Sequence, residues 1–214
     1  RPDQNALIFV STETNQEKVY SFRELHAEVQ RMAAVLKDLG VAKGDRVLIY
    51  MPMIAEAAFA MLACARIGAI HCVVFGGFAS GSLASRIEDA EPKAIISADA
   101  GSRGGKAVGY KPLLDEAISL SKYKPESVLL VDRGLVPMAM VAGRDKLWAP
   151  LREKHLKTLV ECEWVDSTHP SYTLYTSGTT GKPKGVQRDT GGYCVALAAS
   201  MKHIYAGNPG ETYF

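Results

Sequence analysis

The chain has 214 residues, 47% of them hydrophobic, and a formal net charge of +2. This length and apolar content suffice for one large domain or two small ones with packed cores. Acidic and basic residues are interspersed, so a nucleic-acid groove is not expected, and no apolar run approaches the ~18 residues that a membrane span needs.

The first 40 residues predict a pair of short strands followed by a helix. The strands are expected over residues 6–11 and 18–21, around a polar turn. Ser21 followed by Glu24 is a capping box, so the helix should begin directly after the serine. Apolar residues then recur at alternating steps of three and four, which is typical of an amphipathic helix. Gly40 ends this pattern.

The next part of the sequence alternates strands and helices in the rhythm of a parallel α/β sheet. Continuous apolar runs typical of strands covered on both faces are separated by segments with helical spacing. Strands are predicted over residues 45–51, 69–75, 93–98 and 127–131, and helices over 55–67, 79–90 and 113–120. Residues 99–112 are expected to form a glycine-rich loop.

Residues 135–165 give weaker signals, and we expect only a short helix near 149–159. Beyond them, two strands flank a loop rich in glycine, threonine and lysine, and a helix follows. These elements are predicted over residues 171–176, 185–188 and 190–206. Residues 212–214 resemble the start of a further strand. Because a parallel-sheet domain seldom stops there, we expect the chain to be a piece of a longer protein.

Four cysteines, Cys64, Cys72, Cys162 and Cys194, form neither a C-x-x-C pair nor zinc-like spacing with a histidine. We therefore predict no metal site of this kind. We expect buried free thiols in a reducing compartment, which is the cytoplasm or, in a eukaryote, the mitochondrial matrix.

The stretch YTSGTTGKPKG, residues 175–185, has the composition of a phosphate-binding loop. Its glycines let backbone N–H groups approach an anion, and its lysines supply mobile positive charge. It is not the common P-loop, because Thr176 stands in place of the first glycine and Pro183 in place of the magnesium-binding hydroxyl residue. This density and order of residues favour a polyphosphate ligand over a merely polar surface turn.

Residues 174–185, LYTSGTTGKPKG, resemble the signature loop of the adenylate-forming enzymes, which include acyl-CoA synthetases, peptide-synthetase adenylation domains and luciferases. In that family the loop grips the β- and γ-phosphates of ATP while a carboxylate attacks the α-phosphorus. The resemblance implies catalytic roles for Thr179 and Lys184. It implies contacts with ATP for Thr176, Ser177, Gly178, Thr179, Thr180, Gly181, Lys182 and Lys184.

Residues 71–99 and 101–108 resemble the short-chain branch of this family, the acetyl- and propionyl-CoA synthetases. In that branch an Arg-Gly-Gly-basic sequence holds the nucleotide end of coenzyme A, and an arginine can meet a phosphate by a charge-assisted fork. The alternative is a flexible loop with solvated basic side chains. The resemblance implies contacts with coenzyme A for Arg103, Gly104, Gly105, Lys106, Phe75, Gly76 and Gly77.

Residues 185–214 are most similar to the propionyl-CoA synthetases. The resemblance implies ligation of propionate to coenzyme A through propionyl-adenylate, with ATP as co-substrate and Mg²⁺ on its phosphates. AMP and pyrophosphate would be released. The alternatives are an acetyl-CoA synthetase or another short-chain acyl-CoA ligase, and, in a different class, a non-catalytic ATP-binding module. Small-molecule substrates are expected, without nucleic-acid or membrane partners.

The resemblance also implies an α/β fold, with parallel sheets flanked by helices, as part of the large N-terminal domain of an adenylate-forming enzyme. Residues 1–165 would form the first α/β subdomain, with the coenzyme A contacts. Residues 166–214 would begin the second subdomain, with the phosphate loop. No candidates for the family's adenine-binding and C-terminal catalytic residues precede Phe214, so the chain alone is expected to be inactive as a ligase.

Overall fold

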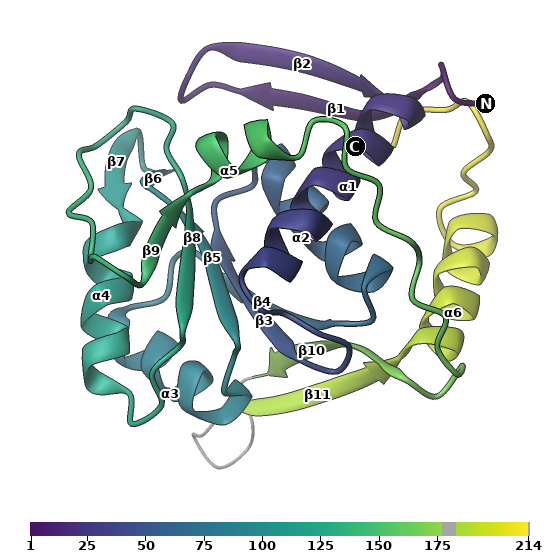
Figure 1. The fold of residues 1–214 in the computed structure, drawn as a ribbon. Helices are drawn as coiled ribbons and strands as arrows, with labels where there is room; N and C mark the ends of the chain where they lie inside the picture. The colour runs from purple at the N-terminus through teal and green to yellow at the C-terminus, as the bar shows by residue number, and fades with distance from the viewer. Residues whose placement is uncertain (177–182, 214) are drawn as a thin grey trace.

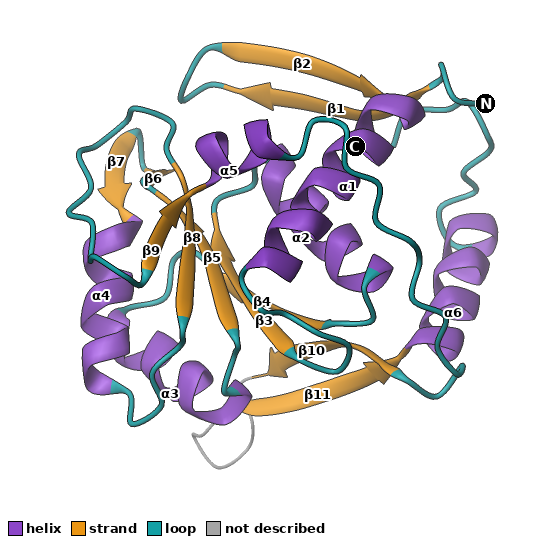
Figure 2. Cartoon of the chain, in the orientation of Figure 1, coloured by secondary structure: helices purple, strands orange, loops and turns teal. Residues whose placement is uncertain are grey.

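The computed structural model describes residues 1–176 and 183–213, drawn in Figures 1 and 2. The helices are α1 (Phe22–Asp38), α2 (Ala55–Arg66), α3 (Ser80–Ala90), α4 (Tyr110–Leu120), α5 (Trp148–Lys154) and α6 (Thr190–His203). The strands are β1 (Asn5–Ser11), β2 (Gln16–Ser21), β3 (Arg46–Met51), β4 (Ile70–Phe75), β5 (Ala94–Ala98), β6 (Ala100–Arg103), β7 (Lys106–Gly109), β8 (Ser127–Val131), β9 (Asp145–Leu147), β10 (Pro170–Thr176) and β11 (Lys184–Asp189).

A seven-stranded sheet in the order β11-β10-β4-β3-β5-β8-β9 organises the chain. Its neighbouring strands are parallel except for β10 and β11, which form an antiparallel pair. The hairpins β1–β2 and β6–β7 lie outside this sheet. The predicted α/β fold with parallel strands flanked by helices is therefore confirmed.

Helices cover both faces of the central strands (Figures 1 and 2). On β3, Val47 and Ile49 belong to the apolar core shared with α1, α2 and α5. Their neighbours Leu48 and Tyr50 belong to the core under α3 and α4. Because successive side chains of a strand point to opposite faces, a strand covered on both sides needs apolar residues at every position. This explains the continuous apolar runs in the sequence.

The capping box that predicts the start of α1 is present. The Ser21 hydroxyl accepts a hydrogen bond from the backbone N–H of Glu24 at 3.2 Å, and the Glu24 carboxylate accepts one from the Ser21 N–H at 2.8 Å. After the helix, Gly40 has a φ of +81°, a left-handed conformation that glycine adopts without strain. Both ends of α1 are thus fixed by local sequence.

The prediction of a glycine-rich loop over residues 99–112 is wrong. Strands β6 and β7 pair as an antiparallel hairpin whose two-residue turn is Gly104 and Gly105, with φ of +58° and +76°. Two positive φ angles are what a type I′ hairpin turn requires, and glycine supplies them. Helix α4 then begins at Tyr110, three residues earlier than predicted, because Pro112 is tolerated in a first helical turn.

Other expectations also fail. Strand β4 is not covered on both faces, since Val73 is 38% and Phe75 71% exposed. Residues 212 and 213 form no strand, and Phe214 lies outside the described residues. Cys64 and Cys72 are buried free thiols as expected, whereas Cys162 and Cys194 are exposed. Among the helices that the described residues form, none is long and apolar enough to cross a lipid bilayer.

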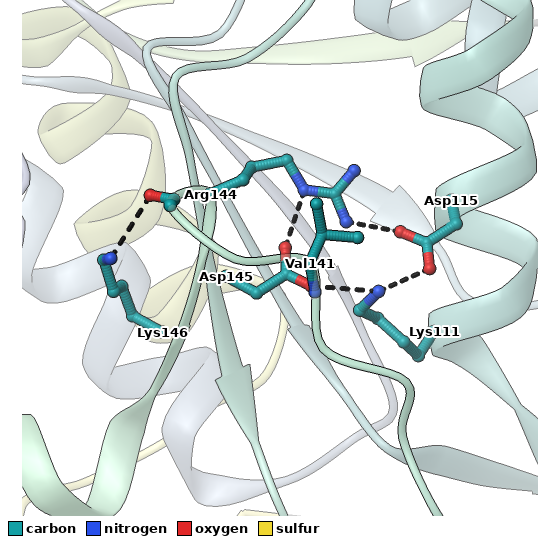
Figure 3. Close-up of polar contacts among 7 residues, drawn as sticks. Lys111, Asp115, Val141, Arg144, Asp145 and Lys146 are labelled. Carbon is teal, nitrogen blue, oxygen red and sulfur yellow. Dashed lines mark hydrogen bonds and ion pairs between the residues drawn. The ribbon is translucent and has the colours of Figure 1, made fainter.

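Strand β9, which the sequence does not predict, is joined to α4 by a cluster of buried and half-buried charges (Figure 3). Lys111, only 1% exposed, lies 3.0 Å from the Asp145 carboxylate and also pairs with Asp115. Arg144 donates to Asp145 at 2.6 Å and to Asp115. Burial of Asp145 opposes ionisation, but hydrogen bonds from Arg144, the Val141 N–H and Lys111 outweigh it and hold the carboxyl pKa below its usual value. The pairs satisfy one another, as buried charges require.

Candidate functional site

The two segments predicted to contact coenzyme A follow the carboxyl ends of two parallel strands of the sheet. The turn of residues 75–78 follows β4, and the hairpin β6–β7 follows β5. Strands β4 and β5 lie on either side of β3, and α2 and α3 cover opposite faces of the sheet. Ligands of open α/β sheets bind at such points, where the connections leave in opposite directions.

Tyr110, which the sequence did not single out, joins these two segments. Its ring stacks on that of Tyr50, with centroids 4.9 Å apart and an interplanar angle of 28°. A Cβ added at Gly76 would lie 2.1 Å from the Tyr110 hydroxyl oxygen, and one added at Gly101 would lie 2.5 Å from it. Both positions therefore need glycine because of close packing, and Gly76 needs no ligand to explain it.

The side chain of Tyr50 fixes the backbone of the turn of residues 75–78. The Tyr50 hydroxyl lies 3.3 Å from the carbonyl oxygens of both Gly76 and Phe78, which share its single proton. Burial raises the Tyr50 pKa to about 12, so the hydroxyl keeps its proton. A Cβ at Gly77 would lie 2.3 Å from the ring of Phe75. The exposed ring of Phe75 is thus held at the surface, where a flat ligand could stack on it.

The tip of the hairpin β6–β7 is open. A Cβ at Gly104 or Gly105 would meet nothing within 4 Å, and Lys106 is exposed. Arg103 pairs with Lys106 through its backbone, while its side chain lies outside the described part of the structure. Glu13, in the turn between β1 and β2, accepts a hydrogen bond from the Ser102 N–H at 2.6 Å. A second hairpin therefore supports the one predicted to bind coenzyme A.

The predicted phosphate loop lies between β10 and β11. Thr176 and Lys184 form the last pair of this hairpin, and both are exposed. Tyr175, one residue earlier, donates a hydrogen bond from its hydroxyl to the Asp89 carboxylate at 2.8 Å. Burial and this carboxylate raise the Tyr175 pKa above its usual value. The other predicted ATP-binding residues lie outside the described residues: Ser177, Gly178, Thr179, Thr180, Gly181 and Lys182.

Helix α3 connects the two predicted binding regions. It starts directly after the turn of residues 75–78, and its last turn contacts Tyr175 through Asp89. The structure thus packs both predicted coenzyme A segments against Tyr110. It also places Tyr175 against the far end of α3. Tyr175 belongs to the end of β10, which we call the arm of the predicted phosphate loop. Arg86 lies between the two regions. Its position three residues after Leu83, on the apolar face of the predicted helix, is a signal that could have identified it.

Comparisons with known proteins agree with these motifs. A family profile described as AMP-binding enzyme matches residues 1–214. The propionate–CoA ligase of Escherichia coli is 60% identical over 214 residues, which are 100% of this chain and 34% of that ligase. An acetyl-coenzyme A synthetase of Methylorubrum extorquens is 48% identical over 217 residues, covering 100% of this chain and 33% of that protein.

A solved structure shares the fold. Acetoacetyl-CoA synthetase from Streptomyces lividans superposes with a TM-score of 0.81 at 30% identity, covering 94% of this chain and 30% of that one. The chain spans about a third of the length of the curated relatives that it matches. Family profile, sequence relatives and fold agree over nearly the whole chain, which confirms the predicted resemblance. The chain therefore belongs to the AMP-binding enzyme family.

Proposed function

We propose that the whole protein ligates propionate to coenzyme A with ATP, through propionyl-adenylate, and releases AMP and pyrophosphate. The observation that carries this proposal is the 60% identity to a propionate–CoA ligase, which extends over all 214 residues and so includes both predicted binding regions. The 48% identity to an acetyl-coenzyme A synthetase keeps a different short-chain acid as the second candidate.

On the ATP side, the exposed pair of Thr176 and Lys184 supports the proposal. The lysine charge would stabilise the negative charge on the phosphates as the α-phosphoryl group is transferred. Thr179 would act with it, and Ser177, Gly178, Thr180, Gly181 and Lys182 would complete the cradle. ATP would bring Mg²⁺ with it. Since no group of three or more His, Cys, Asp or Glu side chains in the described residues could hold a metal, we assign the ion to no side chain.

On the coenzyme A side, the open glycine turn and the exposed ring and ammonium groups support the proposal. Backbone at Gly104 and Gly105 has room for a ligand to approach closely, because a Cβ there would meet nothing within 4 Å. Phe75 offers a surface for an adenine ring, and Lys106, together with Arg103, offers charge for phosphate. Gly76 and Gly77 would act by keeping the turn compact.

The proposal includes two subdomains, residues 1–165 and 166–214. The ladder between β10 and β4 has one pair, Tyr172 with His71, which is compatible with a boundary there. It also includes a reducing location, the cytoplasm or the mitochondrial matrix, because the cysteines are free.

The test is a substrate series with the purified full-length protein. ATP, Mg²⁺ and coenzyme A are supplied with acetate, propionate or butyrate, and AMP and acyl-CoA are quantified. We expect AMP formation to depend on the acid and kcat/KM to be highest for propionate. A higher value for acetate would favour the acetyl-CoA synthetase alternative. ATP binding without AMP formation from any of the acids would favour a non-catalytic nucleotide-binding module.

A further inference from the structure

Arg86 is a buried cation that lies between two aromatic rings. It is 7% exposed and lies on α3, among the apolar side chains of the core. Its guanidinium carbon is 4.1 Å from the centroid of the Phe78 ring and 5.6 Å from that of the Tyr175 ring. One ring belongs to the turn predicted to contact coenzyme A, and the other to the arm of the phosphate loop.

The polar contacts of Arg86 are few. One terminal nitrogen donates to the Ser82 carbonyl at 2.6 Å, one helical turn earlier. The buried Nε has no hydrogen-bond partner among the described residues, and none of their carboxylates forms an ion pair with this guanidinium. Burial of a charge without an acidic partner is costly. A methionine would fill similar space without that cost, so packing alone does not explain an arginine here.

Helix α3 contacts the arm of the predicted phosphate loop on one side of Arg86 and the coenzyme A turn on the other. Asp89, three residues further along the same helix face, holds the Tyr175 hydroxyl at 2.8 Å. At the other end of the helix, the carbonyl of Phe78 accepts from Tyr50 at 3.3 Å, which fixes the backbone that carries the Phe78 ring. The guanidinium is therefore the part of α3 that touches a ring from each region.

We propose that Arg86 is a positioning residue that holds the coenzyme A turn and the arm of the phosphate loop in one arrangement. The proposal rests on the proposed function. It implies that adenylation, which needs no coenzyme A, depends on the same side chain as coenzyme A binding. The planar guanidinium can lie against both rings at once, which the compact ammonium of lysine cannot do equally well.

The experiment measures two quantities separately in the full-length protein. Propionate-dependent exchange of labelled pyrophosphate into ATP reports adenylation without coenzyme A. The KM for coenzyme A in propionyl-CoA formation reports the second region. For Arg86→Met we expect exchange to fall and this KM to rise, each by about 2- to 30-fold, which corresponds to losing a buried cation–π contact. Arg86→Lys should recover part of both.

A matched control and a second variant keep the test decisive. Arg46 contacts the C-terminal end of α3 through the Ala90 carbonyl at 2.7 Å and touches neither ring, so Arg46→Met should change neither quantity. Phe78→Leu removes a ring of the coenzyme A turn and leaves the charge. It should nevertheless lower pyrophosphate exchange, which a purely local role of Phe78 would not do.

The outcomes separate the inference from the function on which it rests. If Arg86→Met changes only one quantity or neither, while the wild-type protein forms propionyl-CoA, the inference is wrong and the function stands. If the wild-type protein shows no acid-dependent exchange and no acyl-CoA formation, both are wrong. Should Arg86→Met not fold, unchanged exchange in Phe78→Leu overturns the inference by itself.

Discussion

Strand β5 and helix α6 are both rich in apolar residues, yet every residue of β5 is buried and none of α6 is. Ile96 of β5 has no exposed surface, whereas Val195 of α6 is 71% exposed. The central parallel strands are covered on both faces by helices of the same chain. The β10–β11–α6 segment, defined as residues 170–203, has one ladder pair with the rest of the sheet, and Tyr175 also contacts α3.

This difference shows which region of the described residues supplies the stabilising apolar contacts. The core of β3, β5 and β8 is expected to resist local unfolding, because free energies of opening follow buried apolar contacts. The β10–β11–α6 segment, which includes the strands on either side of the predicted phosphate loop, has few such contacts. The following predictions test this contrast in the 214-residue chain, by denaturant unfolding followed by circular dichroism.

The largest effect is expected in the centre of the core. Ile96→Ala should lower the free energy of unfolding by about 2–5 kcal/mol, since it deletes buried methyl groups and leaves a cavity. Val195→Ala in α6 should change it by no more than about 0.5 kcal/mol, because an exposed valine packs against little and alanine favours a helix. Equal losses in the two variants would show that the contrast between these regions is wrong.

A smaller effect is expected in the turn of residues 75–78, which packs like the core although it lies at the surface. Gly76→Ala places a methyl group against the Tyr110 hydroxyl and should cost about 1–3 kcal/mol. Gly81→Ala is the matched control, because a Cβ there meets nothing within 4 Å on a helix. It should be neutral or stabilise by up to about 1 kcal/mol. If Gly76→Ala left the free energy of unfolding unchanged, the turn would behave like the exposed β10–β11–α6 segment instead.

A pH-dependent effect is expected at the bridge between the two regions, where His71 stacks on Tyr172. Burial lowers the His71 pKa to about 4, so the folded state binds its proton less readily than the unfolded state does. The contribution of His71 to stability is then complete above the unfolded pKa of about 6.5 and is lost as the pH falls toward 4. His71→Phe should flatten the dependence of unfolding free energy on pH in this window. If the pH dependence of the unfolding free energy stayed unchanged in this variant, titrating groups other than His71 would account for it.

Local rules account for most of the elements. The Ser21–Glu24 box and Gly40 set the ends of α1, and apolar runs identified the central strands. Hairpin β6–β7 was missed because Gly104 and Gly105 suggested flexibility, although two glycines between short strands also predict a type I′ turn. Strand β9 has only three residues, and its pairing depends on β8 and on the buried charges of Lys111 and Asp145.

The candidate site could be predicted from the sequence only in part, for a physical reason. Motif residues such as Thr176 and Lys184 can be proposed from the sequence because phosphate binding needs particular residue types in one short stretch. The residues proposed to position them act across long sequence separations. Arg86 touches Tyr175, 89 residues later in the numbering, and Tyr110 touches Gly76, 34 residues earlier. No local pattern specifies such contacts, since they arise only when the sheet forms.

The phosphate loop itself is tested most directly by replacing its two lysines. Lys182→Ala and Lys184→Ala are combined in the full-length protein, and propionate-dependent pyrophosphate–ATP exchange is measured beside Lys202→Ala, an exposed lysine of α6. We predict a loss of at least about 100-fold in the double variant, as for other groups that stabilise transition-state charge, with exchange by Lys202→Ala and the unfolding midpoints of both variants unchanged. Exchange at the wild-type rate in the double variant would contradict the assignment of this loop to ATP.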